Sequence, residues 1–228
     1  MFQTRENDIS TPENGRDRIL RRYKQMEPYP RLFARFKLMI DPMFSELTRL
    51  LESSAHVETI IDVGTGYGVP ACWFLERFPE AKVYGIEPNH ERVRVASMAV
   101  QKRGVIKWGR APEIPTLPGL ADAAFMLDMT HFLTNEELGL ALKRLHNALS
   151  RGGSLIIRAV IPPDKRPSWL WRFQRVNLKI TGTPCYYSSV DEIKGMIIEA
   201  GFKMELCVPS GSNQESAWFI AKRCPDHE

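Results

Sequence analysis

Residues 60–68 read Ile60-Ile61-Asp62-Val63-Gly64-Thr65-Gly66-Tyr67-Gly68, an apolar run that leads into three alternating glycines. This pattern predicts a strand at about 58–63, followed by a turn whose backbone can approach a ligand closely because glycine has no Cβ. A helix predicted at about 69–78 would direct its free N-terminal N–H groups back towards the turn. The stretch therefore indicates a ligand-binding turn between a buried strand and a helix.

A second strand is predicted at about 82–87, and it ends in the carboxylate of Glu87. In a parallel α/β sheet, an acid at this place accepts hydrogen bonds from a ribose diol. The two features together predict that the chain binds a cofactor containing a nucleoside.

The glycine spacing distinguishes between cofactors. A dinucleotide fingerprint, G-x-G-x-x-G, would need its third glycine at position 69, which is Val69. Instead, Asp62 stands just before the first glycine, and a carboxylate beside the turn suits a cationic ligand better than a pyrophosphate. S-adenosylmethionine carries a sulfonium and an ammonium group and no phosphate, so it is the favoured cofactor.

At these residues the sequence resembles the class I (Rossmann-like) S-adenosylmethionine-dependent methyltransferases. Their first motif is hydrophobic-Asp/Glu-x-Gly-x-Gly-x-Gly, and their second strand ends in an acid; the resemblance spans roughly residues 58–222. It implies that Asp62 lies near the cofactor's ammonium group and that Glu87 accepts both ribose hydroxyls. The cofactor-binding residues implied by the resemblance are Asp62, Gly64, Thr65, Gly66, Tyr67, Gly68, Glu87, Pro88, Ala111, Asp128 and Met129. At the adenine site the family often has an acid where this chain has Arg110. Either the Ala111 backbone alone holds the ring, or Arg110 stacks on the ring or faces solvent.

The rest of the pattern predicts an α/β fold. Further strands are expected at about 105–108, 123–128 and 154–160, and further helices at about 89–102, 135–149 and 190–200. Such alternation indicates a parallel sheet with helices on both faces. Two last strands, at about 203–208 and 216–222, are joined by a turn-rich segment and so predict an antiparallel hairpin. The expected fold is a three-layer, Rossmann-like arrangement with a seven-stranded, mostly parallel sheet that ends in this hairpin.

Four parts of the chain are predicted. They are a flexible tail at 1–15, an N-terminal helical lid at 16–55, the S-adenosylmethionine-binding methyltransferase domain at 56–228 and, within it, a substrate-cap insert at 162–188. Within the lid, Pro28 and Pro30 are predicted to stop a helix and set an extended elbow.

The segment after the fourth strand, Asp128 to Phe132, should border the transferable methyl group, as the resemblance implies. His131 is the expected general base, since the reference pKa of histidine is about 6.5. The alternatives are a histidine packed at the start of the next helix, or one that only supports the cofactor. Asp128 is a candidate catalytic residue too, as a base, as a ligand on the sulfonium side or as a helix cap.

The insert after strand five carries an apolar stripe that includes Trp169 and Phe173. Its length and composition suit an aromatic-lined cover over an apolar or aromatic acceptor. The predicted acceptor-binding residues are Tyr23, Tyr29, His131, Trp169 and Phe173. The basic residues of the insert suit an acidic carrier protein or an anionic membrane surface, by weak contact.

The sequence therefore predicts methyl transfer from S-adenosylmethionine, with S-adenosylhomocysteine as product, to a small, partly hydrophobic or aromatic acceptor. Transfer to oxygen or carbon is favoured over nitrogen, and the acceptor is either free or bound to a carrier. The alternative is a non-catalytic S-adenosylmethionine-binding partner or regulatory subunit, and a less favoured one is an NAD(P)-dependent reductase.

Composition restricts the other classes. The formal net charge of +4 over 228 residues, with no contiguous basic module, argues against nucleic-acid binding. No apolar run has the length of a transmembrane span and no signal-peptide core is seen, so a cytoplasmic location is expected. The four cysteines form no C-x-x-C pair, which predicts neither a metal site nor a disulfide framework. Monomer and homodimer both remain open.

Overall fold

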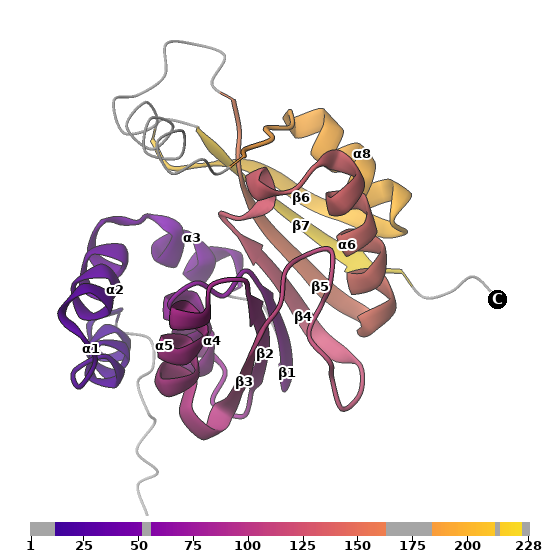
Figure 1. Ribbon diagram of the computed structural model, residues 1–228. Coiled ribbons are helices and arrows are strands. Elements are labelled where there is room, and N and C mark those ends of the chain that lie inside the picture. Colours follow the sequence, from indigo (N-terminus) through magenta and orange to yellow (C-terminus); the bar gives the residue numbers. More distant parts are fainter. Residues whose placement is uncertain (1–11, 52–55, 163–183, 213–214, 225–228) are drawn as a thin grey trace, which may run out of the picture.

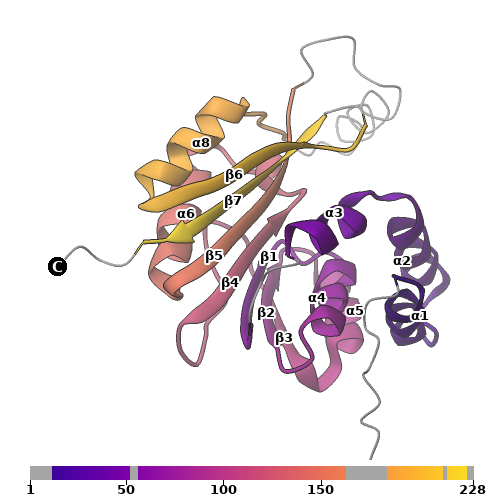
Figure 2. The same ribbon diagram turned by 180° about the vertical axis from the view of Figure 1, so that it is seen from behind.

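The sheet has the predicted form. The computed structural model describes residues 12–51, 56–162, 184–212 and 215–224. In these residues, seven strands form one sheet in the order β3-β2-β1-β4-β5-β7-β6 (Figures 1 and 2). The strands are β1 Thr59–Val63, β2 Lys82–Glu87, β3 Gly104–Trp108, β4 Ala121–Leu127, β5 Leu149–Val160, β6 Phe202–Ser210 and β7 Ser216–Arg223. Strands β1 to β5 pair in parallel, whereas β7 runs antiparallel to both β5 and β6.

Helices cover both faces of this sheet. One face carries α4 (Val69–Arg77) and α5 (His90–Val100), and the other carries α6 (Asn135–Ala148) and α8 (Val190–Glu199) (Figure 1). Because side chains alternate along a strand, Ile60 packs into the apolar cluster of the first face and Ile61 into that of the second. The three-layer α/β prediction is confirmed.

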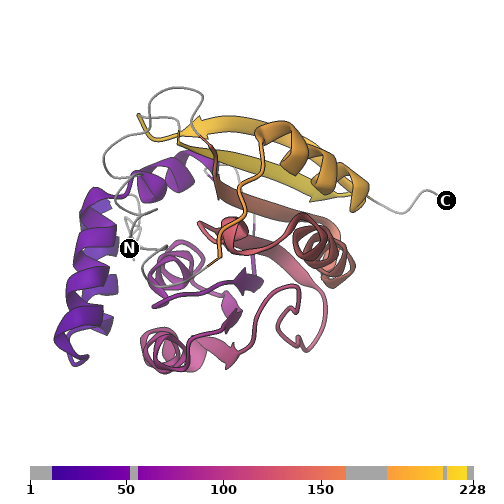
Figure 3. The same cartoon turned by 45° about the horizontal axis from the view of Figure 1, so that its top comes forward.

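Three N-terminal helices lie beside the first face. They are α1 (Pro12–Arg22), α2 (Pro28–Ile40) and α3 (Met43–Leu50). Seen from the top, the violet helices α2 and α3 curve along one side of the molecule, and the orange α8 lies on the opposite side (Figure 3). No described helix is long and apolar enough to cross a membrane.

Two local predictions were wrong. The elbow at Pro28 and Pro30 is the start of α2, because the first turn of a helix has no intrahelical use for the N–H that proline lacks. Strand β5 begins at Leu149, where the end of a helix and a turn were expected. Leu149 pairs with Ala121 across a register irregularity, so the segment joins the sheet although Gly152 adopts a positive φ of 75°. In addition, α1 begins at Pro12, before the predicted start of helical structure at residue 16.

The strand order fixes where a ligand binds. Strand β1 has β2 on one side and β4 on the other, so the chain reverses its direction of winding between β1 and β4. In open α/β sheets, ligands bind outside the carboxyl ends of the strands at this switch point. The loops after β1, β2 and β4 therefore border the expected ligand site.

Candidate cofactor and acceptor site

The glycine turn after β1 is built from left-handed backbone. Gly64, Gly66 and Gly68 have φ values of 80°, 58° and 80°, which residues with a Cβ rarely adopt. A Cβ on Gly68 would lie 3.0 Å from the Cα of Ala96, so this glycine also lets α4 pack closely on α5. A Cβ on Gly66 would meet no atom within 4 Å. The backbone at Gly66 therefore faces open space that a ligand can enter.

Glu87 ties this turn to the end of β2. Its buried carboxylate accepts a 2.9 Å hydrogen bond from the Gly66 N–H and a 3.2 Å hydrogen bond from the Asn89 N–H. The guanidinium of Arg92 lies 3.7 Å from the same carboxylate. Since each carboxylate oxygen has two lone pairs, both can still accept a hydrogen bond from a ligand hydroxyl. The sequence predicted the position of Glu87 but not its bond to the turn.

Asp62 is a buried acid whose carboxyl group is only partly hydrogen-bonded within the described residues. Its Oδ2 makes no hydrogen bond within the part of the chain that the structure describes. Burial raises the pKa of the Asp62 carboxyl to about 7, a hydrogen bond from Thr65 opposes this, and the charge of Glu87 adds to it. An unsatisfied buried carboxylate is unfavourable, and a ligand cation would relieve it. The site thus fits the ammonium end of S-adenosylmethionine, with Glu87 placed for the ribose.

The predicted adenine side lies at the ends of β2 and β3. Ala111 is buried, and the Pro88 carbonyl accepts a 2.9 Å hydrogen bond from the indole N–H of Trp108. The guanidinium of Arg110 lies 3.7 Å from the Glu137 carboxylate on α6. Arg110 is therefore exposed and directed to α6.

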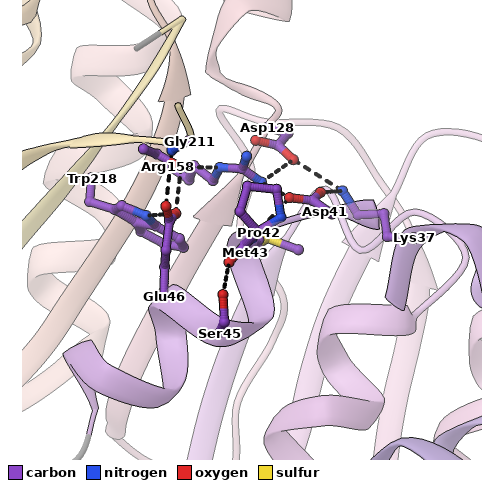
Figure 4. Close-up of polar contacts among 11 residues, drawn as sticks. Lys37, Asp41, Pro42, Met43, Ser45, Glu46, Asp128, Arg158, Gly211 and Trp218 are labelled. Carbon is purple, nitrogen blue, oxygen red and sulfur yellow. Dashed lines mark hydrogen bonds and ion pairs between the residues drawn. The ribbon is translucent and has the colours of Figure 1, made fainter. Parts of the chain in front are cut away.

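The loop after β4 reaches the same place. A Cβ on Gly64 would lie 3.0 Å from the Met129 side chain, so the loops after β1 and β4 are in direct contact. Asp128 has a φ of 56° and donates its backbone N–H to the Arg158 carbonyl, at 2.9 Å. Its carboxylate lies 3.1 Å from the Lys37 ammonium and 3.3 Å from the Arg158 guanidinium (Figure 4). These two ion pairs hold the loop after β4 against α2 and β5.

A second carboxylate completes this cluster. Asp41 lies 2.8 Å from Lys37 and 2.7 Å from Arg158 (Figure 4). Burial would raise the pKa of Asp41, but the charges of Lys37 and Arg158 lower it below its ordinary value. Helix α2 is thereby connected to the ends of β4 and β5 through alternating charges.

Glu46 on α3 extends the cluster to the hairpin. Its carboxylate accepts hydrogen bonds from the Ser210 hydroxyl, the Gly211 N–H and the Trp218 indole, at 2.6, 2.9 and 2.7 Å (Figure 4). The Arg158 guanidinium donates to the Ser210 hydroxyl at 3.0 Å, which joins the two groups. No spacing in the sequence predicts this network; the one signal for it is a charged residue, Arg158, inside an otherwise apolar strand.

His131 is buried beside this loop. Its ring stacks on Tyr187 with centroids 5.8 Å apart and an interplanar angle of 4°. Among the described residues, Nδ1 has no hydrogen-bond partner. Burial lowers the pKa of His131 to about 4, although the Asp128 charge opposes the shift. The imidazole is therefore neutral at physiological pH.

The predicted acceptor residues do not all meet. Tyr23 is fully buried, and its hydroxyl donates a 2.8 Å hydrogen bond to the Tyr67 carbonyl. It supports the glycine turn from the core side and does not border open space, contrary to the prediction. Tyr29 is exposed and makes an edge contact with the Tyr67 ring at 5.9 Å. Trp169 and Phe173 lie outside the described residues.

No metal site accompanies these groups. Within residues 12–51, 56–162, 184–212 and 215–224, no group of three or more histidine, cysteine, aspartate or glutamate side chains could hold a metal ion.

Comparisons with known proteins agree with this geometry. Residues 61–157 match the family described as a methyltransferase domain. An uncharacterized methyltransferase of Geobacillus kaustophilus is 28% identical over 141 residues, which are 61% of this chain and 65% of that protein. The chain thus spans slightly less than two thirds of this curated relative.

Solved structures share the fold at low identity. The pyocyanin biosynthetic protein PhzM superimposes with a TM-score of 0.65 at 18% identity, over 89% of this chain and 60% of that one. The magnesium protoporphyrin IX methyltransferase of Synechocystis PCC 6803, solved with bound S-adenosylhomocysteine, gives 0.60 at 18% identity, over 93% and 95% of the two chains. Together with the strand order, these matches show a methyltransferase domain over residues 61–157 within a Rossmann-like methyltransferase fold.

Proposed function

We propose that the protein transfers the methyl group of S-adenosylmethionine to oxygen or carbon of a small, partly hydrophobic or aromatic acceptor. The observation that carries this proposal is the unpartnered Oδ2 of buried Asp62 beside the open Gly66 backbone. Such an arrangement is unfavourable in the free protein and favourable around a cation. The family match supports the same cofactor.

The chain's own residues have distinct parts in this proposal. When bound, S-adenosylmethionine supplies an electrophilic methyl group. Asp62 and Glu87 hold opposite ends of the donor. Met129 packs on Gly64 and lines the side of the site that the loop after β4 forms. Fixing donor and acceptor in line removes much of the entropic barrier to a one-step displacement. In this proposal the neutral imidazole of His131 takes the proton of an acceptor hydroxyl, and its pKa of about 4 favours acidic, phenolic or enolic acceptors.

A turnover assay tests the proposal. The protein is incubated with S-adenosylmethionine carrying a deuterated methyl group and with a panel of phenols, enolic compounds and acids bound to a carrier protein, and the products are analysed by mass spectrometry. We expect label in at least one hydroxyl or carbon acceptor. Tight binding of S-adenosylhomocysteine without any labelled product would instead support a non-catalytic partner subunit. Tighter binding of NADH than of S-adenosylhomocysteine would overturn the cofactor assignment.

His131 should affect rate and not cofactor affinity. We expect His131→Gln to lower kcat by about 100-fold, the ordinary contribution of a positioned base. Calorimetric titration with S-adenosylhomocysteine should give a Kd within about twofold of the wild type, since no cofactor contact is assigned to the ring. Because the pKa of His131 is lowered to about 4, its protonation should leave kcat flat between about pH 6 and pH 8. An unchanged kcat in the variant would remove His131 from the mechanism.

Asp62 should make cofactor binding depend on pH. The folded protein holds a proton on Asp62 up to about pH 7, whereas the unfolded chain loses it near its ordinary pKa of 3.8. In the free protein this residue therefore lowers stability as the pH rises from about 4 to 7. A bound cation favours the carboxylate, so S-adenosylmethionine affinity should fall on the order of tenfold from pH 7.5 to pH 6, with release of a proton on binding. Titration calorimetry in buffers with different ionisation enthalpies measures both quantities, and Asp62→Asn should remove the proton release.

A further inference from the structure

The outer face of α2 is apolar and exposed. Tyr29, Leu32, Phe36, Met39 and Ile40 are each between 50% and 69% exposed. Leu32, Phe36 and Met39 stand at i, i+4 and i+7, so they form one stripe along the helix. Large apolar side chains gathered on one face of a helix indicate an interaction surface rather than chance exposure.

Basic side chains lie directly beside this stripe. A groove of about 760 Å³ separates α1 from α2, and Met39 of the stripe forms part of its lining. Its charged lining residues are Arg16, Asp17, Arg21, Lys24, Arg31 and Arg35. Apart from Asp17, these residues are cations, and the described residues provide no ion-pair partner for any of the five. In contrast, Arg18 and Arg22 of α1 both pair with Glu76.

We propose that this surface, the apolar stripe of α2 together with the five cations of the groove, docks the protein on an anionic phospholipid membrane. A helix that lies in the membrane interface needs an apolar face that can enter the acyl boundary and basic residues beside it that meet the lipid phosphates. The stripe and the groove supply both. The stripe is the convex side of a helix, which suits a deformable lipid surface better than a rigid partner.

A second copy of this chain fits the surface less well. A two-fold interface places the same patch on both partners, so it would bring ten cations and two Asp17 side chains together. Such like-charge contact opposes dimerisation. Anionic lipid headgroups neutralise the same charges.

The inner side of α2 shows what this docking would achieve. Lys37 on that side pairs with Asp128, and the Phe33 ring lies 5.1 Å from the Tyr67 ring in the glycine turn. Tyr29, at the end of the exposed stripe, contacts Tyr67 as well. A membrane held against α2 would therefore lie next to the mouth of the proposed site, where a lipophilic acceptor could enter from the bilayer. Docking itself does not require the proposed methyl transfer.

Vesicle flotation tests the proposal on the chain of 228 residues. The protein is mixed with vesicles of phosphatidylcholine alone, or of phosphatidylcholine with about one third phosphatidylglycerol. We expect flotation with the anionic vesicles, little with the neutral ones, and weaker flotation as salt rises, because the headgroup attraction is screened. A protein that stays in the soluble fraction with anionic vesicles would overturn the proposal.

Paired variants locate the surface. Arg31→Gln/Arg35→Gln should weaken partition into anionic vesicles by about 30-fold, at about fivefold for each basic residue. Leu32→Ser/Phe36→Ser should weaken it by at least about tenfold through lost apolar burial. The matched controls are Lys143→Gln/Arg144→Gln and Leu140→Ser/Ile198→Ser, which change exposed residues of α6 and α8.

The control variants distinguish docking through α2 from a general effect of losing surface charge or apolar area. The proposal holds if both α2 variants lose partition while the α6 and α8 controls keep it, and if S-adenosylhomocysteine affinity is the same in all five proteins. Equal losses in the control variants would overturn the assignment to α2. A dimer in light scattering that the α2 variants dissociate, without flotation of the wild type, would assign the surface to a second copy instead.

Discussion

The Glu87→Ala variant should bind S-adenosylhomocysteine about 100-fold more weakly than the wild type. Two losses combine in this change. The ribose loses a charged acceptor, and charge-assisted hydrogen bonds of this kind contribute about 1.5–3 kcal/mol. The Gly66 N–H also loses its 2.9 Å hydrogen bond, which holds the backbone of the turn in the orientation that faces open space. Isothermal titration calorimetry measures the Kd directly.

Two further variants make this result specific. Glu87→Gln keeps one acceptor oxygen for the Gly66 N–H and should lose only about tenfold in affinity. Glu91→Ala removes an exposed carboxylate from the first turn of α5 and should leave the Kd unchanged. If Glu87→Ala bound S-adenosylhomocysteine as tightly as the wild type, the cofactor would lie elsewhere.

The cofactor half of the site could be predicted because its signals are local. An acid, three glycines and a strand-end carboxylate each have a fixed meaning at the carboxyl edge of a parallel sheet. Asp62 and Glu87 therefore appear where the sequence predicted them, at the ends of β1 and β2. What the pattern could not give is that Glu87 bonds to the Gly66 backbone, since this contact depends on how the turn closes.

The N-terminal helices could not be predicted to the same depth because their contacts are tertiary. Periodicity shows that Tyr23 belongs to a helix, but only the packed structure shows its hydroxyl bonded to Tyr67 inside the core. The alternating charges of Lys37, Asp41 and Arg158 come from α2, the residue that follows it and β5, which no spacing rule brings together. Sequence reasoning treated Arg158 as one residue of an apolar strand.

The Arg158→Met variant should lower the free energy of unfolding by about 3–5 kcal/mol, the usual effect of removing one partner from a buried ion pair. Arg158 is buried, lies 2.7 Å from Asp41 and 3.3 Å from Asp128, and stacks on Trp218 at 5.8 Å. Methionine can fill much of the volume, so the loss would come mainly from Asp41 and Asp128, which would keep only Lys37 of their two cations. Urea denaturation at pH 7 measures the difference, and Lys37→Met, which removes the more exposed cation, should lose clearly less.

The pH dependence separates this cause from a packing defect. In the wild type the pKa values of Asp41 and Glu46 lie below their ordinary values. Burial raises the pKa of Asp41, but the charges of Lys37 and Arg158 lower it by more. Burial likewise raises the pKa of Glu46, but the hydrogen bonds from Ser210, Gly211 and Trp218 lower it by more. A carboxyl with a lowered pKa stabilises the fold above its unfolded pKa, and that contribution is lost as the pH falls through the folded value. The deficit of Arg158→Met should therefore be largest above about pH 5 and shrink towards pH 3, as the carboxylates become protonated in both proteins. A deficit that stayed constant over this range would come from packing around Trp218, and the charges would then have no part in holding α2 and α3 against the sheet.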